Sequence, residues 1–257
     1  MTVHPHGSAS ARISLVVPCF NEARRLNLQK FHRFLAESIE VRIFFVDDGS
    51  HDETLEILKD FQQEHEHRVQ VLSHQVNQGK AEAVRTGIIF ALSNFQQEMI
   101  GYWDADLATP LESVMRLASV LDGNSHIEMV FGSRVKLCGR HIERRPVRHY
   151  LGRVFATVVS TLLRIPIYDT QCGAKIFRIT QETRYIYSEP FISKWVFDVE
   201  ILARYMHLYS ASVLEKRIYE YPLEMWADIA GSKVRPRDFF RAFVDIAKIK
   251  RKYLQKT

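Results

Sequence analysis

The sequence of 257 residues has few cysteines and no long apolar run. Its three cysteines, Cys19, Cys138 and Cys172, form no Cys-x-x-Cys pair, which argues against a disulfide framework and a zinc site and predicts reduced thiols. Its apolar stretches fall short of the about 20 residues that a membrane-spanning helix needs, and residues 1–11 lack the apolar region of a secretory signal. We therefore expect no membrane-spanning segment and a cytoplasmic protein.

Several generic catalytic motifs are also missing. No Gly-x-Gly-x-x-Gly follows a strand, which excludes a Rossmann dehydrogenase. Gly79 and Lys80 match the end of a phosphate-binding P-loop, but His74 stands where the loop needs its first glycine and Ala81 where it needs Ser or Thr. Neither His-Glu-x-x-His nor Gly-x-Ser-x-Gly occurs, so a zinc peptidase and an α/β-hydrolase are excluded as well.

Positive charge is concentrated in two segments. Residues 134–153 carry seven Lys or Arg against one Glu, and residues 234–257 carry eight against two Asp. The formal net charge of the whole chain is only +5, so the rest of the chain is acidic. This distribution predicts a local anionic partner, either phosphate groups in a site or an anionic membrane surface, with two solvated faces as the alternative interpretation.

The first half of the chain alternates between apolar β-branched runs and helical patterns. The expected strands are 13–17, 41–46, 69–72, 99–103 and 129–131, and the expected helices are 26–37, 52–64, 80–92 and 111–121. Such alternation predicts an α/β fold with a mostly parallel central sheet flanked by helices, in which ligands bind outside the carboxyl ends of the strands. We expect one domain over residues 1–257, with its core at about 12–233.

The regular alternation stops at Arg134. From there we expect a long basic loop, followed by a helix near 150–164, a strand at 172–177, a helix around 196–207, a strand near 212–221 and a basic amphipathic C-terminal helix within 234–257. Apolar residues recur at helical spacing in the first and last of these helices, beside basic residues. Packing on the core or on a second copy is one interpretation, and peripheral contact with an anionic membrane face is the other.

Acidic residues gather where two of the expected strands end. Asp47 and Asp48 close the second strand, where a glycine permits a tight turn and Asp52 is placed to cap the next helix, so a purely structural turn is one interpretation. Asp104 and Asp106 follow the fourth strand and are separated by one alanine. Two carboxylates at this spacing can both approach a hard divalent cation if the strand end bends.

Four motifs follow one another in the first half, at residues 17–22, 46–50, 77–80 and 104–107, and four more follow at 131–134, 169–175, 197–200 and 226–233. In this order they resemble the inverting glycosyltransferases of family 2, which have the GT-A fold. The second half narrows the resemblance to the dolichyl-phosphate β-glucosyltransferases and their bacterial polyprenyl-phosphate relatives. The sequence departs from both groups in lacking their transmembrane helices.

The resemblance implies a site for a nucleotide sugar such as UDP-glucose. The residues expected to hold this donor are Pro18, Phe20, Glu22, Asp47, Asp48, Gly79, Lys80 and Asp104. It also implies that Asp104 and Asp106 bring Mg²⁺ or Mn²⁺ to the diphosphate, where the cation stabilises the departing nucleoside diphosphate. With these two aspartates, Arg134 and Asp198 complete the expected catalytic set.

The resemblance further implies transfer of glucose or another hexose to a polyprenyl or dolichyl phosphate. A lipid monophosphate is already an anionic nucleophile, so it needs groups that hold it rather than a base. The expected acceptor-binding residues are Arg134, Arg144, Arg145, Arg148, Arg153, Gln171 and Lys233.

Two alternatives remain at this stage. A hydroxyl acceptor on a glycan or protein would need a general base, for which Asp198 and Glu200 are the candidates. The other alternative is a non-catalytic module that binds a nucleotide sugar or RNA through its basic segments. We expect no nucleic-acid partner, because the acidic strand ends would repel RNA at the pocket.

Overall fold

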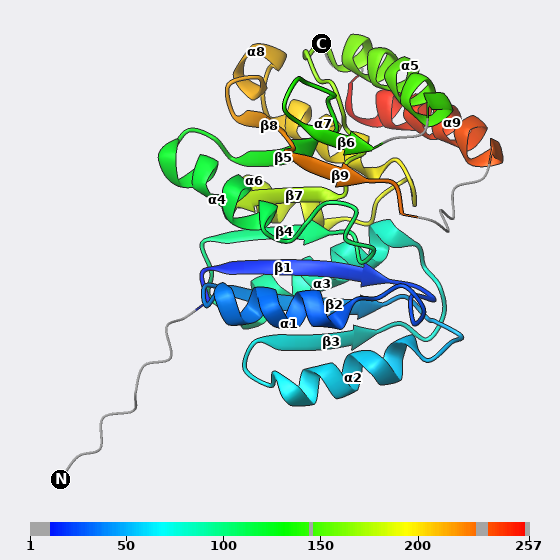
Figure 1. Cartoon of the computed structure of the whole chain (residues 1–257). Coiled ribbons are helices and arrows are strands. Elements are labelled where there is room, and N and C mark those ends of the chain that lie inside the picture. Colours follow the sequence, from blue (N-terminus) through cyan, green and yellow to red (C-terminus); the bar gives the residue numbers. More distant parts are fainter. Residues whose placement is uncertain (1–10, 144–145, 230–235, 255–257) are drawn as a thin grey trace.

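The computed structural model describes residues 11–143, 146–229 and 236–254, and its centre is a seven-stranded sheet of order β3-β2-β1-β4-β7-β5-β8 (Figure 1). The strands are β1 (Ile13–Cys19), β2 (Val41–Asp47), β3 (Val69–Ser73), β4 (Met99–Trp103), β5 (Met129–Ser133), β7 (Ala174–Arg178) and β8 (Ile218–Pro222). Only β7 runs against its neighbours β4 and β5. The predicted mostly parallel sheet is therefore confirmed.

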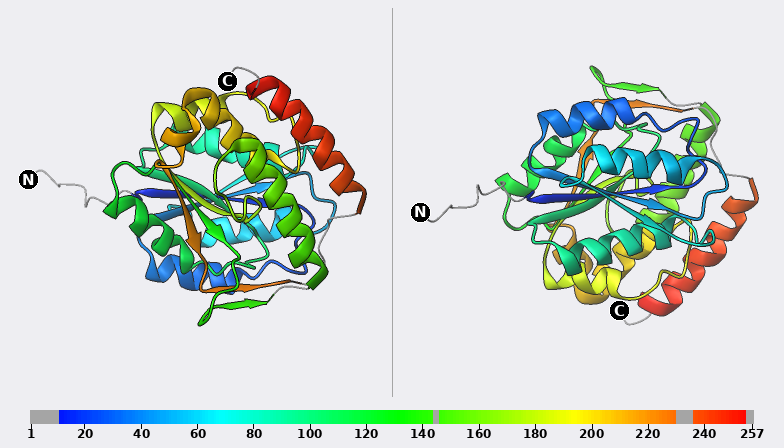
Figure 2. Two further views of the ribbon diagram at one scale, coloured as in Figure 1. Left: turned by 90° about the horizontal axis from the view of Figure 1, so that it is seen from above. Right: turned by 90° about the horizontal axis from the view of Figure 1, so that it is seen from below.

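Helices cover both faces of this sheet (Figure 2). They are α1 (Leu28–Glu37), α2 (Thr54–Glu64), α3 (Lys80–Asn94), α4 (Ser113–Gly123), α5 (Pro146–Leu163), α6 (Gln181–Ser188), α7 (Phe197–Leu208), α8 (Ala211–Leu214) and α9 (Pro236–Tyr253). Side chains of β1 alternate between the two faces: Leu15 belongs to the buried cluster that contains residues of α1, α2 and α4, whereas Val16 belongs to the one that contains residues of α3, α5 and α7. Because both faces of the sheet are covered, the strand is apolar along most of its length, and such continuous apolar runs made the strands recognisable in the sequence.

The second half differs from the prediction in its short elements. The expected strand at 212–221 is divided into the single-turn helix α8 and the strand β8. The helix α6, capped by the side chain of Thr180, was not expected. Two three-residue strands, β6 (His141–Glu143) within the expected basic loop and β9 (Met225–Ala227), pair in parallel. Pairs this short depend on tertiary contacts, such as the burial of Ile142 and Trp226 opposite each other, and leave no periodic signal.

The C-terminal helix α9 ends in Lys250, Arg251 and Lys252, as the prediction of a basic helix requires. Within the parts of the chain that the structure describes, no helix has the length and apolar character needed to cross a membrane.

Candidate active site

The acidic motifs meet at one edge of the sheet. The strand β1 lies between β2 and β4, so the carboxyl ends of these three parallel strands are neighbours (Figure 1). Asp47 is the last residue of β2, and Asp104 directly follows β4. In parallel sheets this edge is where ligands bind.

Asp48 holds the loop that leads into α3. Its Oδ1 accepts a hydrogen bond from the backbone N–H of Gln78 at 2.9 Å and lies 2.8 Å from Nδ1 of His74, and its Oδ2 accepts from the N–H of Gly79 at 2.7 Å. Gly79 adopts a φ of 100°, which a side chain would strain, and α3 begins immediately after it. Both oxygens of Asp48 are thus engaged by its own chain, and through them Asp48 positions the loop before α3; its direct contact with the donor stays a prediction.

Asp47 is placed differently. It is 2% exposed, and its Oδ2 accepts a hydrogen bond from the N–H of Ser50 at 3.2 Å. Its Oδ1 is buried without a hydrogen-bond partner among the described residues. A buried carboxylate oxygen without a donor costs free energy, so this atom is suited to accept a hydrogen bond from a ligand.

Three further donor-site predictions lie at or just beyond the end of β1. Pro18 and Phe20 are half-buried, and the Phe20 ring meets the edge of His51 with 6.3 Å between centroids. Glu22 is 7% exposed, and both of its oxygens accept hydrogen bonds from Arg25, at 2.9 and 2.6 Å. Glu22 therefore fixes the side chain of Arg25. The sequence analysis did not single out Arg25, although an acid and a base three residues apart on one helical turn are a recognisable pair.

Lys80, Asp104 and Asp106 form the charged centre of the site. Lys80, the first residue of α3, places Nζ 2.5 Å from Oδ1 of Asp104, and both side chains are about one third exposed. Burial opposes the charge of Lys80, yet Asp104 and Asp198 raise its pKa above the usual value. Burial and the neighbouring charge of Asp104 raise the pKa of Asp106, although a hydrogen bond from the N–H of Ala108 counteracts this.

The two aspartates fit a hard divalent cation. They offer carboxylate oxygens, the ligand type that Mg²⁺ and Mn²⁺ prefer, and their mutual repulsion is what a cation would relieve. A Cβ atom at Gly173, just before β7, would overlap the carboxylate of Asp104. The glycine therefore makes the room in which Asp104 lies.

Asp198 lies behind this centre, at the start of α7. It is 4% exposed, and its Oδ1 accepts hydrogen bonds from the buried Nζ of Lys175 at 2.5 Å and from the hydroxyl of Tyr102. Asp198 still contributes to the raised pKa of Lys80, so its charge acts at the site. Lys175 belongs to a motif noted in the sequence, but its contact with Asp198 carried no local signal.

Glu200, the alternative base, is enclosed. It is fully buried and pairs with Arg204 at 2.8 Å, and it also accepts a hydrogen bond from the N–H of Ile192 at 2.7 Å. This is a structural ion pair within α7, not the acceptor-facing carboxylate considered from the sequence.

Arg134 is oriented by an acidic network. Its Nε and Nη2 donate to the carboxylate of Asp169 at 2.6 and 2.7 Å, and its guanidinium lies over the ring of Trp226. The N–H of Asp169 in turn donates to Glu220 at 2.6 Å. Burial opposes the charge of Arg134, but Asp169 and, more weakly, Asp104 raise its pKa. The guanidinium of Arg134 is thus held in place and stays positively charged near Asp104.

The expected acceptor residues are only partly placed. The Nε2 atom of Gln171 is buried and has no hydrogen-bond partner among the described residues. Arg153 stacks on the ring of Tyr168, with 3.4 Å from the guanidinium carbon to the ring centroid. Three of the predicted residues, Arg144, Arg145 and Lys233, lie outside the described residues, and Arg148 lies in α5 with a side chain that is not described.

A family model for glycosyl transferase family 2 matches residues 14–183, a range that contains the charged centre. The dolichyl-phosphate beta-glucosyltransferase of Dictyostelium discoideum is 32% identical to this chain over 257 aligned residues, which cover 94% of this chain and 75% of that protein.

Two solved structures are similar in fold. Glucosyl-3-phosphoglycerate synthase from Mycobacterium tuberculosis, in complex with Mn²⁺, UDP and glucosyl-3-phosphoglycerate, matches with a TM-score of 0.64 at 18% identity, covering 98% of this chain and 86% of that one. A mannosyltransferase from Pyrobaculum calidifontis, in complex with GDP-Man and Mn²⁺, matches with a TM-score of 0.63 at 16% identity, covering 96% of this chain and 65% of that one. These likenesses confirm the predicted GT-A fold.

Proposed function

Because the chain belongs to glycosyl transferase family 2, we propose that this glycosyltransferase moves glucose from UDP-glucose to a polyprenyl phosphate of the dolichyl phosphate class. The observation that carries the proposal is the grouping of Asp104, Asp106 and Lys80 at the sheet edge that also holds the unpartnered oxygen of Asp47. Similarity to dolichyl-phosphate beta-glucosyltransferase supports the choice of acceptor. Family membership sets aside the non-catalytic binding module.

A nucleoside diphosphate suits the donor half of the site. The buried Oδ1 of Asp47 can accept a hydrogen bond from the N–H of a base or from a ribose hydroxyl. Phe20 directly follows Cys19, the β1 residue that pairs with Asp47, and its half-buried ring offers an apolar surface for the base. Lys80 provides a positive charge for the diphosphate at the N-terminus of α3, where the helix dipole also favours anions.

Asp104 and Asp106 would hold Mg²⁺ or Mn²⁺, which when bound stabilises the negative charge of the departing diphosphate. Lys80 neutralises part of the charge of Asp104 from the opposite side. Arg25, oriented by Glu22, is close enough to lower the pKa of Asp106 and so favours its charged form. The positive charges of Lys80 and Arg25 offset the carboxylates at this edge of the sheet, so that an anionic donor can bind there.

The proposed transfer needs no proton acceptor. An oxygen of the acceptor phosphate forms the bond to the anomeric carbon of glucose while the bond from that carbon to UDP breaks, and the electron pair leaves with UDP. The configuration inverts because attack and departure take place on opposite faces. The engagement of Asp198 by Lys175 and Tyr102 supports an acceptor of this kind, since a base must be available to take a proton.

The acceptor phosphate would meet Gln171 and Arg134, which both bond to Asp169. The unpartnered Nε2 of Gln171 is a donor suited to a phosphate oxygen, and Arg134 adds a fixed positive charge. The roles of Arg144, Arg145, Arg148 and Lys233 in holding this phosphate remain predictions.

A lipid acceptor implies contact with a membrane, and α5 offers a surface for it. Tyr150, Val154 and Val158 are 70%, 60% and 38% exposed and recur every four residues, so they form one apolar stripe. The helices α5 and α9 both pack on α7 (Figure 1). The last turn of α9 carries exposed basic residues. We propose that this stripe enters the surface of an anionic membrane on its cytoplasmic face, with the basic residues facing the lipid headgroups.

Vesicle binding tests the membrane contact. Val154→Asp should reduce sedimentation with vesicles that contain phosphatidylserine, whereas Val76→Asp, at a 67% exposed valine far from α5 in the sequence, should not. Equal sedimentation of both variants and the parent protein would contradict the proposed surface, without affecting the proposed reaction.

Transfer itself is tested with labelled UDP-glucose, Mn²⁺ or Mg²⁺, and a polyprenyl phosphate in detergent, by counting the label that moves into the organic phase. We expect metal-dependent transfer that Asp106→Asn abolishes and Asp60→Asn, at an exposed aspartate of α2, leaves intact. Metal-dependent release of free glucose without transfer would favour a hydroxyl acceptor instead. The absence of both transfer and release would overturn UDP-glucose as the donor. The assay would then be repeated with GDP-mannose and other nucleotide sugars.

A further inference from the structure

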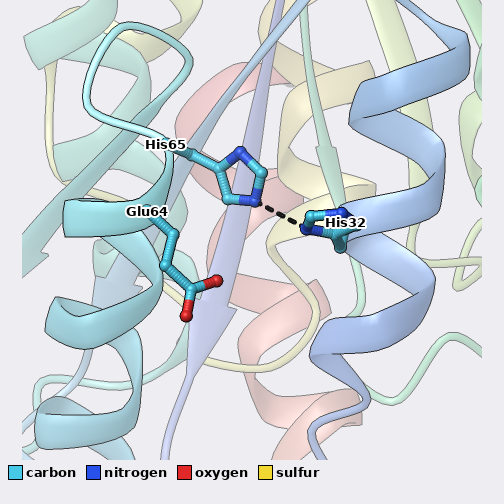
Figure 3. Close-up of side chains that lie close together, drawn as sticks. All are labelled: His32, Glu64 and His65. Carbon is cyan, nitrogen blue, oxygen red and sulfur yellow. Dashed lines mark hydrogen bonds between the residues drawn. The ribbon is translucent and has the colours of Figure 1, made fainter.

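Two histidines meet on the face of the sheet covered by α1 and α2. His32 lies in α1, and His65 is the C-cap residue that directly follows α2. Nδ1 of His32 and Nε2 of His65 are 3.1 Å apart, and their ring centroids are 5.0 Å apart (Figure 3). Glu64, the last residue of α2, places a carboxylate oxygen beside them, so that the three ligand atoms all lie within 4.8 Å of one another.

This spacing matches a shared transition-metal ion. With Zn–N bonds of about 2.0–2.1 Å and a tetrahedral angle, two nitrogen ligands of one zinc lie about 3.3 Å apart. The two imidazole nitrogens are already at nearly this separation (Figure 3). A single N–H···N hydrogen bond accounts for the contact of the two rings, and the neighbouring carboxylate of Glu64 adds a third ligand atom that this bond does not use.

The two histidines stand on rigid parts of the backbone. The N–H of His65 donates to the carbonyl of Gln62 at 3.0 Å, and its ring packs against Phe61, which is 3% exposed, with 4.6 Å between centroids. The helix that carries His32 is anchored by the buried Phe31 beside it. Preorganised ligands lose little entropy when they bind an ion. His32 and Glu64 are exposed, so an ion can enter from solvent.

The ligand set selects a different metal from the strand-end site. Two imidazole nitrogens and one carboxylate suit zinc and similar borderline ions, with the fourth position left to water. Asp104 and Asp106 offer oxygen ligands alone, which suit Mg²⁺ and Mn²⁺. We propose that His32, His65 and Glu64 form a second metal site, which binds Zn²⁺ or a similar divalent transition metal and fastens α1 to α2.

Such a site would stabilise the part of the fold that carries the donor motifs. The loops before α1 and α2 already contact each other, since the N–H of Asn21 donates to Ser50 at 2.9 Å and the N–H of Glu22 to Thr54 at 2.8 Å. An ion that joins His32 to His65 adds a second link between the two helices that follow these loops. The proposal is independent of which sugar or acceptor the enzyme uses.

Thermal unfolding of the full chain, freed of metal with a chelator, tests the proposal. Excess Mg²⁺ is present throughout to occupy the strand-end site. We expect Zn²⁺ at a hundredfold excess over its Kd to raise the Tm by about 5 °C or more. The rise should be lost in His32→Asn and in His65→Asn and retained in His67→Asn, at an exposed histidine of the same loop that is outside the cluster.

Two readings complete the experiment. Calorimetric titration should give one Zn²⁺ site per chain that both variants lose, and Co²⁺ should give the visible absorption of a tetrahedral complex in the parent protein alone. Because each variant is compared with and without metal, loss of the histidine hydrogen bond does not enter the comparison. A Zn²⁺-induced rise in Tm of equal size in both variants, or no saturable Zn²⁺ binding in the parent protein, would overturn the proposal.

Discussion

Lys175 and Asp198 form an ion pair inside the protein, with 2.5 Å between Nζ and Oδ1 and side-chain exposures of only 1% and 5%. Nζ also donates to the carbonyls of Thr170 and Cys172, at 3.0 and 2.5 Å, so all three ammonium protons have acceptors. The pair joins β7 to the start of α7, directly behind the charged centre of the site. Its charges are mutually compensated and expensive to separate.

Removing one partner of this pair should be more harmful than removing both. Lys175→Met leaves the carboxylate of Asp198 buried without its cation, and we expect a loss of about 3–5 kcal/mol in the free energy of unfolding. The double variant with Asp198→Asn should lose less than the sum of the single losses. Urea denaturation measures all of these, with Lys59→Met, at an exposed residue of α2, as the control. Strictly additive losses would contradict the coupling.

The sheet and the location of the site were predictable because their causes are local. Leu15 and Val16 face opposite sides of the sheet and are both fully buried, so the strand is a continuous apolar run that is visible in the sequence. Parallel strands place their carboxyl ends together, so Asp47 and Asp104 could be assigned to one edge before any coordinates were known.

The roles of individual carboxylates were not predictable, because partners far along the chain decide them. Asp48 and Asp47 are adjacent and chemically identical, but only Asp48 is engaged by the backbone of Gln78, thirty residues later. Asp198 depends in the same way on Lys175, from another element. The pattern of residue types predicts that the aspartates lie at one edge of the sheet. Hydrogen bonds from distant segments decide which of them keeps an oxygen available for a ligand.

Asn substitutions at Asp47 and Asp48 should therefore have opposite profiles. Asp48→Asn replaces one of two oxygens that accept backbone N–H bonds, so we expect a loss of about 2 kcal/mol in the free energy of unfolding. Asp47→Asn should leave stability nearly unchanged and weaken UDP binding about tenfold or more, since it removes charge from the unpartnered oxygen. Urea unfolding and calorimetric titration with UDP measure the two effects. Equal effects on both properties would show that the two residues were assigned wrongly.

The raised pKa of Asp106 predicts a pH-dependent difference in stability. Since the folded state holds this proton more tightly than the unfolded state, the contribution of Asp106 to stability falls as pH rises from the unfolded pKa of 3.8 through the folded value. Without divalent metal, the free energy of unfolding of Asp106→Asn should thus increase relative to that of the parent protein as pH rises, and the difference should persist at neutral pH. Urea unfolding of both proteins across this range, with chelator, measures the difference.

Divalent metal should reverse this order. Mn²⁺ neutralises the charge of Asp104 and Asp106, so it should stabilise the parent protein at neutral pH and stabilise Asp106→Asn much less. If Mn²⁺ shifts the unfolding midpoint of both proteins equally, the cation does not bind where we place it.

Gly173 should be as necessary as the carboxylate that it accommodates. A methyl group at this position would overlap Asp104, which must then move away from Lys80 and from Asp106. We expect Gly173→Ala to lower kcat/KM for metal-dependent transfer about a hundredfold, because a displacement near 1 Å at a reacting centre has this effect. Gly123→Ala, at the end of α4, is the matched control, since a Cβ there would meet nothing within 4 Å. Circular dichroism should show both variants folded. Full activity in folded Gly173→Ala would show that transfer does not require Asp104 in the position observed here, which contradicts its assignment to the charged centre.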